Sequence, residues 1–87
     1  MKANHDAIKQ LLLTARGQVD GLIKMVDDDR YCVDISNQLL AVTAILKKAN
    51  REVLKAHLEG CVQSALSQED GQTKIQEIVN LLDKMMK

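Results

Sequence analysis

Apolar residues recur along the chain at alternating spacings of four and three, the pattern of helices that pack against other helices. The first such run predicts a helix over residues 6–26, with apolar positions at Ile8, Leu12, Ala15, Val19, Leu22 and Val26. Three consecutive aspartates at 27–29 end the pattern, and aspartate side chains favour turns and helix starts. A short loop is therefore expected after residue 26.

The second apolar run is the longest and predicts a helix over residues 33–65. Its positions are Ile35, Leu39, Val42, Leu46, Ala49, Val53 and Ala56, and the stripe is widened by Leu40, Leu54 and Leu58. So long a stripe on a short chain favours antiparallel pairing with a second copy, in addition to packing against the first helix.

A third helix is expected over residues 73–86, after a turn at 67–72. Thr73, followed three residues later by Gln76, resembles a capping box that starts this helix. In the first helix, Gly17 and Gly21 lower helix propensity by up to about 1 kcal/mol each, which predicts that another helix crosses that face closely. The whole chain, residues 1–87, is thus predicted to be one all-α domain.

Composition supports this fold and narrows the function. The 87 residues include a single aromatic side chain and no proline, so the core must consist of aliphatic side chains on helices. Twelve basic residues balance twelve acidic ones, so net charge does not indicate a nucleic-acid partner. A domain of this size buries only a modest core, which makes a partner chain expected.

No constellation of an enzyme is found: the chain offers no Ser, His and acid set, phosphate-binding loop or paired-carboxylate site. No apolar run approaches the roughly 20 residues that a membrane span needs, and the start of the chain lacks the pattern of a signal peptide. A non-enzymatic, cytoplasmic protein is expected.

The candidate ligands are Cys32, His57 and Cys61. In one helix, a rise of about 1.5 Å per residue puts Cys32 on the order of 40 Å from Cys61, whereas His57 and Cys61 share a face. The three side chains meet only if a second copy runs antiparallel alongside, so the sequence predicts a site shared by two chains. Two thiolates and one imidazole suit Cu(I) in trigonal geometry better than Zn(II), which usually takes a fourth ligand. His5, near the start of the chain, is expected to be solvated.

Four segments carry a resemblance to the CsoR family of bacterial repressors. They are Arg16-Gly17-Gln18-Val19-Asp20-Gly21, Arg30-Tyr31-Cys32-Val33-Asp34-Ile35, Ala49-Asn50-Arg51 and His57-Leu58-Glu59-Gly60-Cys61. The resemblance implies three-helix protomers that form an antiparallel dimer and then a dimer-of-dimers tetramer. It also implies a Cu(I) site made by Cys32 of one protomer with His57 and Cys61 of the other, in which Tyr31 and Glu77 surround the ligand histidine.

The resemblance further implies binding to operator DNA that weakens when the sensor site is filled. Candidate contacts to the DNA phosphates are the basic side chains Lys9, Arg16, Lys47, Lys48, Arg51 and Lys55. Arg16 and Lys48 stand at positions similar to those of the family. The chain departs from the family pattern at residues 11–13, where three leucines replace the usual basic residues.

Other functions remain open at this point. Within the family, a persulfide sensor would use Cys32 and Cys61 of neighbouring protomers and would not need His57. Nickel and cobalt sensors tend to place a histidine where Cys61 stands, and His5 is their possible additional ligand here; formaldehyde sensors lack that second cysteine. Outside the family, a helical copper-binding protein that never contacts DNA would fit the missing basic residues of the first helix. The combination of His57, Tyr31 and Glu77 favours copper.

Overall fold

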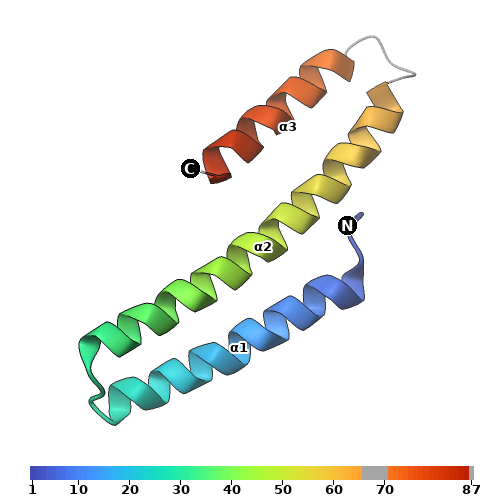
Figure 1. Ribbon diagram of the computed structural model, residues 1–87. Coiled ribbons are helices and arrows are strands. Elements are labelled where there is room, and N and C mark those ends of the chain that lie inside the picture. Colours follow the sequence, from blue (N-terminus) through green and yellow to red (C-terminus); the bar gives the residue numbers. More distant parts are fainter. Residues whose placement is uncertain (66–70, 87) are drawn as a thin grey trace.

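The computed structural model contains three helices joined in a flat zigzag (Figure 1). It describes the backbone of residues 1–65 and 71–86, and the side chains of residues 1–60 and 75–84. Helix α1 spans His5–Asp27, α2 spans Cys32–Ala65 and α3 spans Gly71–Met86. Both α1 and α3 pack against α2 and not against each other, and they lie on opposite sides of that helix. The predicted all-α class and the three helices are confirmed, with boundaries within two residues of those expected.

Local signals explain both ends of α1. The Asn4 side chain caps the helix, since its Oδ1 accepts a hydrogen bond of 3.1 Å from the backbone N–H of Ala7. At the other end, the N–H of Asp28 donates to the carbonyl of Lys24 at 2.9 Å. Asp29 then adopts a left-handed conformation with φ 52°, which aspartate tolerates better than most residues. The aspartate run therefore makes the turn between α1 and α2, as predicted.

The predicted capping box does not start α3. The helix begins at Gly71, two residues before the expected start, so Thr73 lies inside it and is not its capping residue. The Gln76 side chain instead donates from Nε2 to Oδ1 of Asn80 at 3.0 Å, one turn further along α3. Of the predicted turn at 67–72, residues 71 and 72 are helical and the remainder lies outside the described residues.

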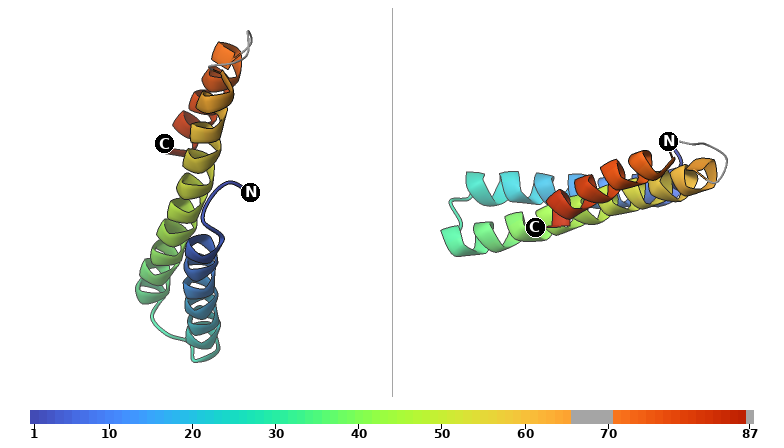
Figure 2. Two further views of the ribbon diagram at one scale, coloured as in Figure 1. Left: turned by 90° about the vertical axis from the view of Figure 1, so that its right-hand side faces the viewer. Right: turned by 90° about the horizontal axis from the view of Figure 1, so that it is seen from above.

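The core of the α1–α2 hairpin is small. Ala15, Leu22 and Val42 are buried together, with Met25, Ile35 and Ile45 packed around them. No described side chain is more than 98% shielded from solvent. The principal extents of 58 × 27 × 11 Å explain this, because 11 Å is about the diameter of one helix and the protomer is a single layer (Figure 2). Stable domains bury helix faces between two layers, so one layer leaves a face uncovered.

That uncovered side, here named the apolar face, consists of residues from both helices of the hairpin. Its members Val19, Ile23, Val26, Leu39 and Leu46 are between 41% and 61% exposed, although the heptad pattern places all of them except Ile23 on the packing seam. They line a groove of about 490 Å³ between α1 and α2. An apolar surface of this extent indicates contact with another chain.

The close helix crossing predicted at Gly17 and Gly21 does not occur within the protomer. No atom outside the helix's own neighbouring backbone lies within 4 Å of the position that a Cβ would take at either glycine. Among the described helices, none combines the length and apolar character that crossing a membrane requires.

Candidate metal centre and nucleic-acid interface

One candidate ligand lies at the hairpin end of the molecule. Cys32 is the first residue of α2, and its thiol is free and exposed to solvent. Tyr31, which precedes it, is 65% exposed. In the protomer, this end of α2 therefore exposes a sulfur donor and a phenol on the molecular surface.

The second candidate ligand lies far along the same helix. His57 is exposed and lines a cavity of about 600 Å³ between the N-terminal residues, α2 and α3. Val53 and Leu54 of α2 and Ile78 and Leu81 of α3 form its apolar walls. Cys61 follows His57 by one helical turn on α2, and its side chain lies outside the described residues. Glu77 is exposed on α3, next to Ile78 in the chain.

The protomer does not bring the predicted ligands together. Because α2 is continuous over Cys32–Ala65, the helical rise separates Cys32 from Cys61 by roughly 40 Å. Tyr31 is separated from His57 and Glu77 in the same way. Among the described side chains, no three His, Cys, Asp or Glu residues are close enough to hold a metal ion. The structure thus agrees with the predicted separation, and one protomer cannot bring Cys32 to Cys61 through its continuous α2 helix.

The donor atoms on α2 match a soft metal. Thiolate sulfur and imidazole nitrogen are the ligands that Cu(I) prefers, whereas magnesium and calcium take oxygen. Of the carboxylates near the cysteine end, Asp28 and Asp29 belong to the turn between the helices, Asp27 ends α1, and Asp34 lies in the first turn of α2. The chemistry of the donor set therefore favours a thiolate- and imidazole-bound metal over a carboxylate-bound one.

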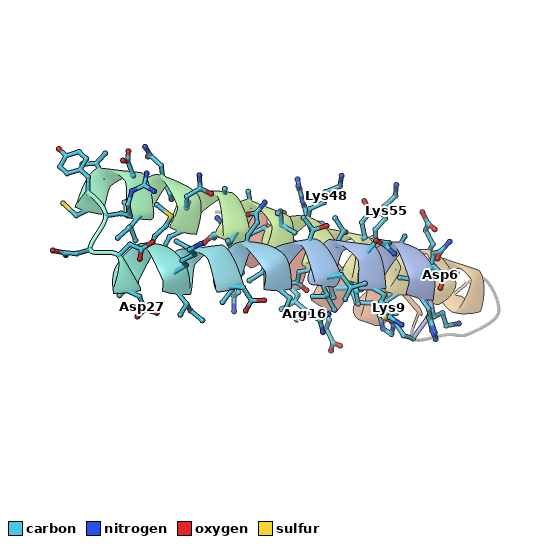
Figure 3. The ribbon with its side chains drawn as sticks, turned by 90° about the horizontal axis from the view of Figure 1, so that it is seen from below. Asp6, Lys9, Arg16, Asp27, Lys48 and Lys55 are labelled. Carbon is cyan, nitrogen blue, oxygen red and sulfur yellow. The ribbon has the colours of Figure 1, made fainter. Side chains whose placement is uncertain are left out.

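The predicted DNA-contact residues do not form one patch. All six are exposed, but four of them project from opposite sides of the hairpin. Figure 3 shows Lys48 and Lys55 on one side of the molecule and Lys9 and Arg16 on the opposite side. A single protomer therefore cannot place all of these side chains against one stretch of DNA backbone.

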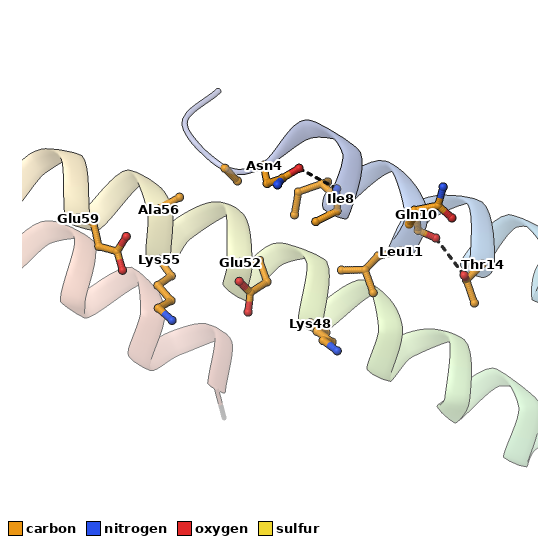
Figure 4. A pocket seen from close by; sticks show the side chains of 12 residues that line it. Asn4, Ile8, Gln10, Leu11, Thr14, Lys48, Glu52, Lys55, Ala56 and Glu59 are labelled. Atoms are coloured by element: carbon orange, nitrogen blue, oxygen red, sulfur yellow. Dashed lines mark hydrogen bonds between the residues drawn. The ribbon is translucent and has the colours of Figure 1, made fainter.

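Two of these lysines belong to a row of alternating charge that the sequence reasoning missed. Lys48, Glu52, Lys55 and Glu59 follow one another along α2 and line a groove of about 460 Å³ beside the first turns of α1 (Figure 4). Gln10, Leu11 and Thr14 form the α1 side of this groove. The spacing of these residues in the sequence, four, three and four, would have predicted that they share one face of the helix. The two carboxylates offset the two ammonium groups, so this charged row has no net charge.

Comparison with known proteins agrees with the resemblance found in the sequence. The family model of the metal-sensitive transcriptional repressor matches residues 4–84. The copper-sensing transcriptional repressor CsoR of Mycobacterium ulcerans is 46% identical over 69 residues, which cover 79% of this chain and 59% of that protein. CsoR of Bacillus subtilis is 39% identical over 82 residues, which cover 94% of this chain and 81% of that protein. The chain thus spans less than two thirds of the Mycobacterium ulcerans relative.

Two solved structures share the three-helix arrangement. The Cu(I)-bound copper-sensing repressor CsoR of Geobacillus thermodenitrificans superposes with a TM-score of 0.76 at 33% identity, over 94% of this chain and 85% of that one. The nickel-responsive transcriptional regulator InrS superposes with a TM-score of 0.81 over 98% of this chain and 96% of that one, at 22% identity, which concerns the fold alone. From the family match over residues 4–84 and these relatives, this chain belongs to the metal-sensitive transcriptional repressors, the CsoR family.

Proposed function

We propose that this protein is a Cu(I)-responsive repressor that binds operator DNA in its metal-free form and releases it when Cu(I) fills a site shared by two protomers. Cys32 of one protomer and His57 and Cys61 of its partner are the ligands. The relatives named above are copper-sensing repressors, and one of the similar structures holds Cu(I). Release of the operator then permits expression of genes for efflux or detoxification.

The observation that carries this proposal is the position of soft donors at the two ends of one continuous helix beside an uncovered apolar face. Cys32 begins α2, and His57 and Cys61 lie near its other end. An antiparallel partner seated on the apolar face brings opposite ends of the two α2 helices together. By two-fold symmetry, the same contact forms two equivalent sites for each dimer.

Coupling to DNA requires that the filled site favour one conformation of the assembly. His57 faces a cavity whose far wall is α3, so a movement of its ring toward the metal changes the contacts between α2 and α3. Glu77 on α3 and the partner's Tyr31 are the groups proposed to orient the imidazole through hydrogen bonds on the side away from the metal. A dimer and then a tetramer repeat the basic side chains by symmetry, which lets several phosphates be neutralised although the chain has no net charge.

A second candidate function, persulfide sensing, is favoured by one feature. The thiol of Cys32 is free and exposed, as a sulfur-accepting cysteine needs to be. In this alternative, Cys32 and Cys61 of neighbouring protomers become joined through sulfur, and His57 has no role. The charged row on α2 gives some support to a third candidate, a copper-binding protein without DNA binding, because its lysines are offset by carboxylates.

A titration of the full-length protein against the promoter upstream of its own gene separates these candidates. We expect a gel shift with the metal-free protein, release on addition of about one Cu(I) per chain, and no release by an organic persulfide donor. Release by the persulfide alone, retained in a His57→Ala variant, would establish the sulfur sensor instead. Absence of any shift at low salt, together with tight Cu(I) binding, would support the copper-binding protein without DNA binding.

A further inference from the structure

The N-terminal segment, residues 1–4, lies against the half of α2 that carries His57. Ala3 is only 8% exposed, which anchors this segment to the helices. The side chain of Lys2 crosses α2 at Gly60, where a Cβ would lie 2.8 Å from Cδ of Lys2, 3.1 Å from Cε and 3.0 Å from Nζ. The distance to Cδ is shorter than real Cβ atoms allow and the other two are unusually tight, so Lys2 occupies space that is open because residue 60 is glycine.

This position puts a positive charge beside the candidate sensor site. Lys2 and Met1 line the same cavity as His57, and Gly60 directly precedes Cys61. No carboxylate among the described side chains forms an ion pair with Lys2. The ammonium group lies where it can act on charge that develops at this end of α2.

The chemistry of the site creates such a charge. Cu(I) bound by two thiolates and a neutral imidazole carries a net charge of −1, and an anionic group covered by an interface is costly unless a cation lies nearby. An ammonium group several ångströms away offsets part of that cost through Coulomb attraction. This attraction acts only on the filled site and adds no ligand to it.

We propose that Lys2, seated over Gly60, is a charge-compensating residue of the sensor site that raises its affinity for Cu(I). The inference rests on the proposed function, since it concerns the same site. Lys2 is a positioning residue and not a metal ligand. The contribution of Lys2 is electrostatic. Gly60, which has no side chain, leaves the space that the Lys2 side chain occupies.

The first test replaces the charge and keeps the stem. In Lys2→Met, we expect Cu(I) affinity to fall by about three- to ten-fold, measured by competition with a chromophoric Cu(I) chelator. The difference from the wild-type protein should shrink as salt is raised, because ions screen the attraction. Lys2→Arg should retain the wild-type affinity, and Lys84→Met, which removes an exposed lysine of α3, serves as the matched control. Circular dichroism and gel filtration verify that each variant keeps its helices and its assembly.

The second test moves the charge and keeps it in the protein. In Gly60→Ala the new methyl group meets the flexible end of Lys2, so the lysine shifts while the helix stays intact, and alanine favours the helix. We expect weaker Cu(I) binding in Gly60→Ala but no further loss when Lys2→Met is added. Equal affinity of Lys2→Met and wild type, or an undiminished effect of Gly60→Ala in the Lys2→Met background, would overturn the inference. If the wild-type protein itself fails to bind Cu(I), the proposed function fails instead.

Discussion

At the scale of single residues, the candidate metal ligands of one protomer lie in two separate places. Cys32 exposes a sulfur at the start of α2, and His57 faces a cavity closed by α3. Neither place can complete a three-ligand site, since the length of α2 separates them. Each ligand is therefore expected to depend on a different chain.

Subunit mixing tests this dependence on two chains. Cys32→Ser and Cys61→Ser homomers should each lose tight Cu(I) binding, because every site lacks one thiolate. A heterodimer of the two variants, purified through two different tags, should bind one Cu(I), since one of its two sites receives all three native ligands. The bound copper is measured after chelator competition. Failure of the heterodimer to regain any site would show that the ligands come from a single chain.

Glu77 allows metal binding to be separated from its effect on DNA. In Glu77→Gln, we expect Cu(I) affinity to stay within a few-fold of wild type while Cu(I)-dependent release of the operator is lost, because in the proposed site the carboxylate holds the imidazole and does not bind the metal. Fluorescence anisotropy of labelled operator DNA, with and without Cu(I), measures the release. Asp83→Asn, a change at another exposed acid of α3, is the control and should release DNA normally.

At the scale of elements, α2 decides how two chains pair. Its 34 residues carry the hairpin core on one side, α3 on another and the exposed Leu39 and Leu46 on the apolar face. An antiparallel pairing that sets Cys32 opposite Cys61 of the partner puts the two-fold axis between positions 46 and 47. The register of the whole dimer follows from that single alignment.

A cysteine placed near this axis should therefore link two chains. In a background of Cys32→Ser and Cys61→Ser, we expect Leu46→Cys to form a disulfide-bonded dimer under mild oxidation, because its two copies lie close enough for a bond. Non-reducing gel electrophoresis detects the product. Glu52→Cys, which changes a member of the charged row, is the comparison and should stay unlinked. Preferential linking through Glu52→Cys would mean that the two-fold axis lies near residue 52 and that the helices pair in a different register.

At the scale of the whole molecule, a single layer about 11 Å thick leaves one apolar face uncovered, and a second copy is proposed to cover it. The symmetry of the proposed dimer would also multiply the basic side chains, of which one protomer places Lys48 and Lys55 on one side and Lys9 and Arg16 on the other (Figure 3). Charge distribution in the assembly, and not net charge of the chain, should then set its affinity for DNA.

The salt dependence of operator binding tests how the charges are distributed over the DNA-binding surface. We expect operator binding to weaken steeply with salt, and Arg16→Gln and Lys48→Gln each to flatten the slope of log K against log salt, by roughly 0.9 for every phosphate that the variant no longer neutralises. Glu52→Gln should tighten binding at low salt, because it removes a negative charge from between Lys48 and Lys55. Anisotropy titrations at several salt concentrations provide the data. An unchanged affinity in Glu52→Gln would place the DNA on another side of the protomer.

Much of the fold followed from local patterns. The apolar spacing predicted three helices because each amphipathic stripe reports a helix that buries one face. The aspartate run predicted the turn, where Asp29 adopts positive φ. The capping box at Thr73 was wrong, because a short motif matches by chance and α3 begins at Gly71. The close approach predicted at Gly17 and Gly21 also failed within the protomer, since glycine spacing alone does not say which neighbour is present.

The sequence by itself determined the helices and the separation of Cys32 from Cys61, because helical period and rise are properties of the local chain. Only the tertiary structure decided which apolar positions stay exposed, where Lys48 and Arg16 project, and that Lys2 lies over Gly60. These features depend on the rotation of each helix about its axis and on packing between segments that are remote in the sequence. Residue spacing restricts that packing, but contacts between remote segments select the arrangement.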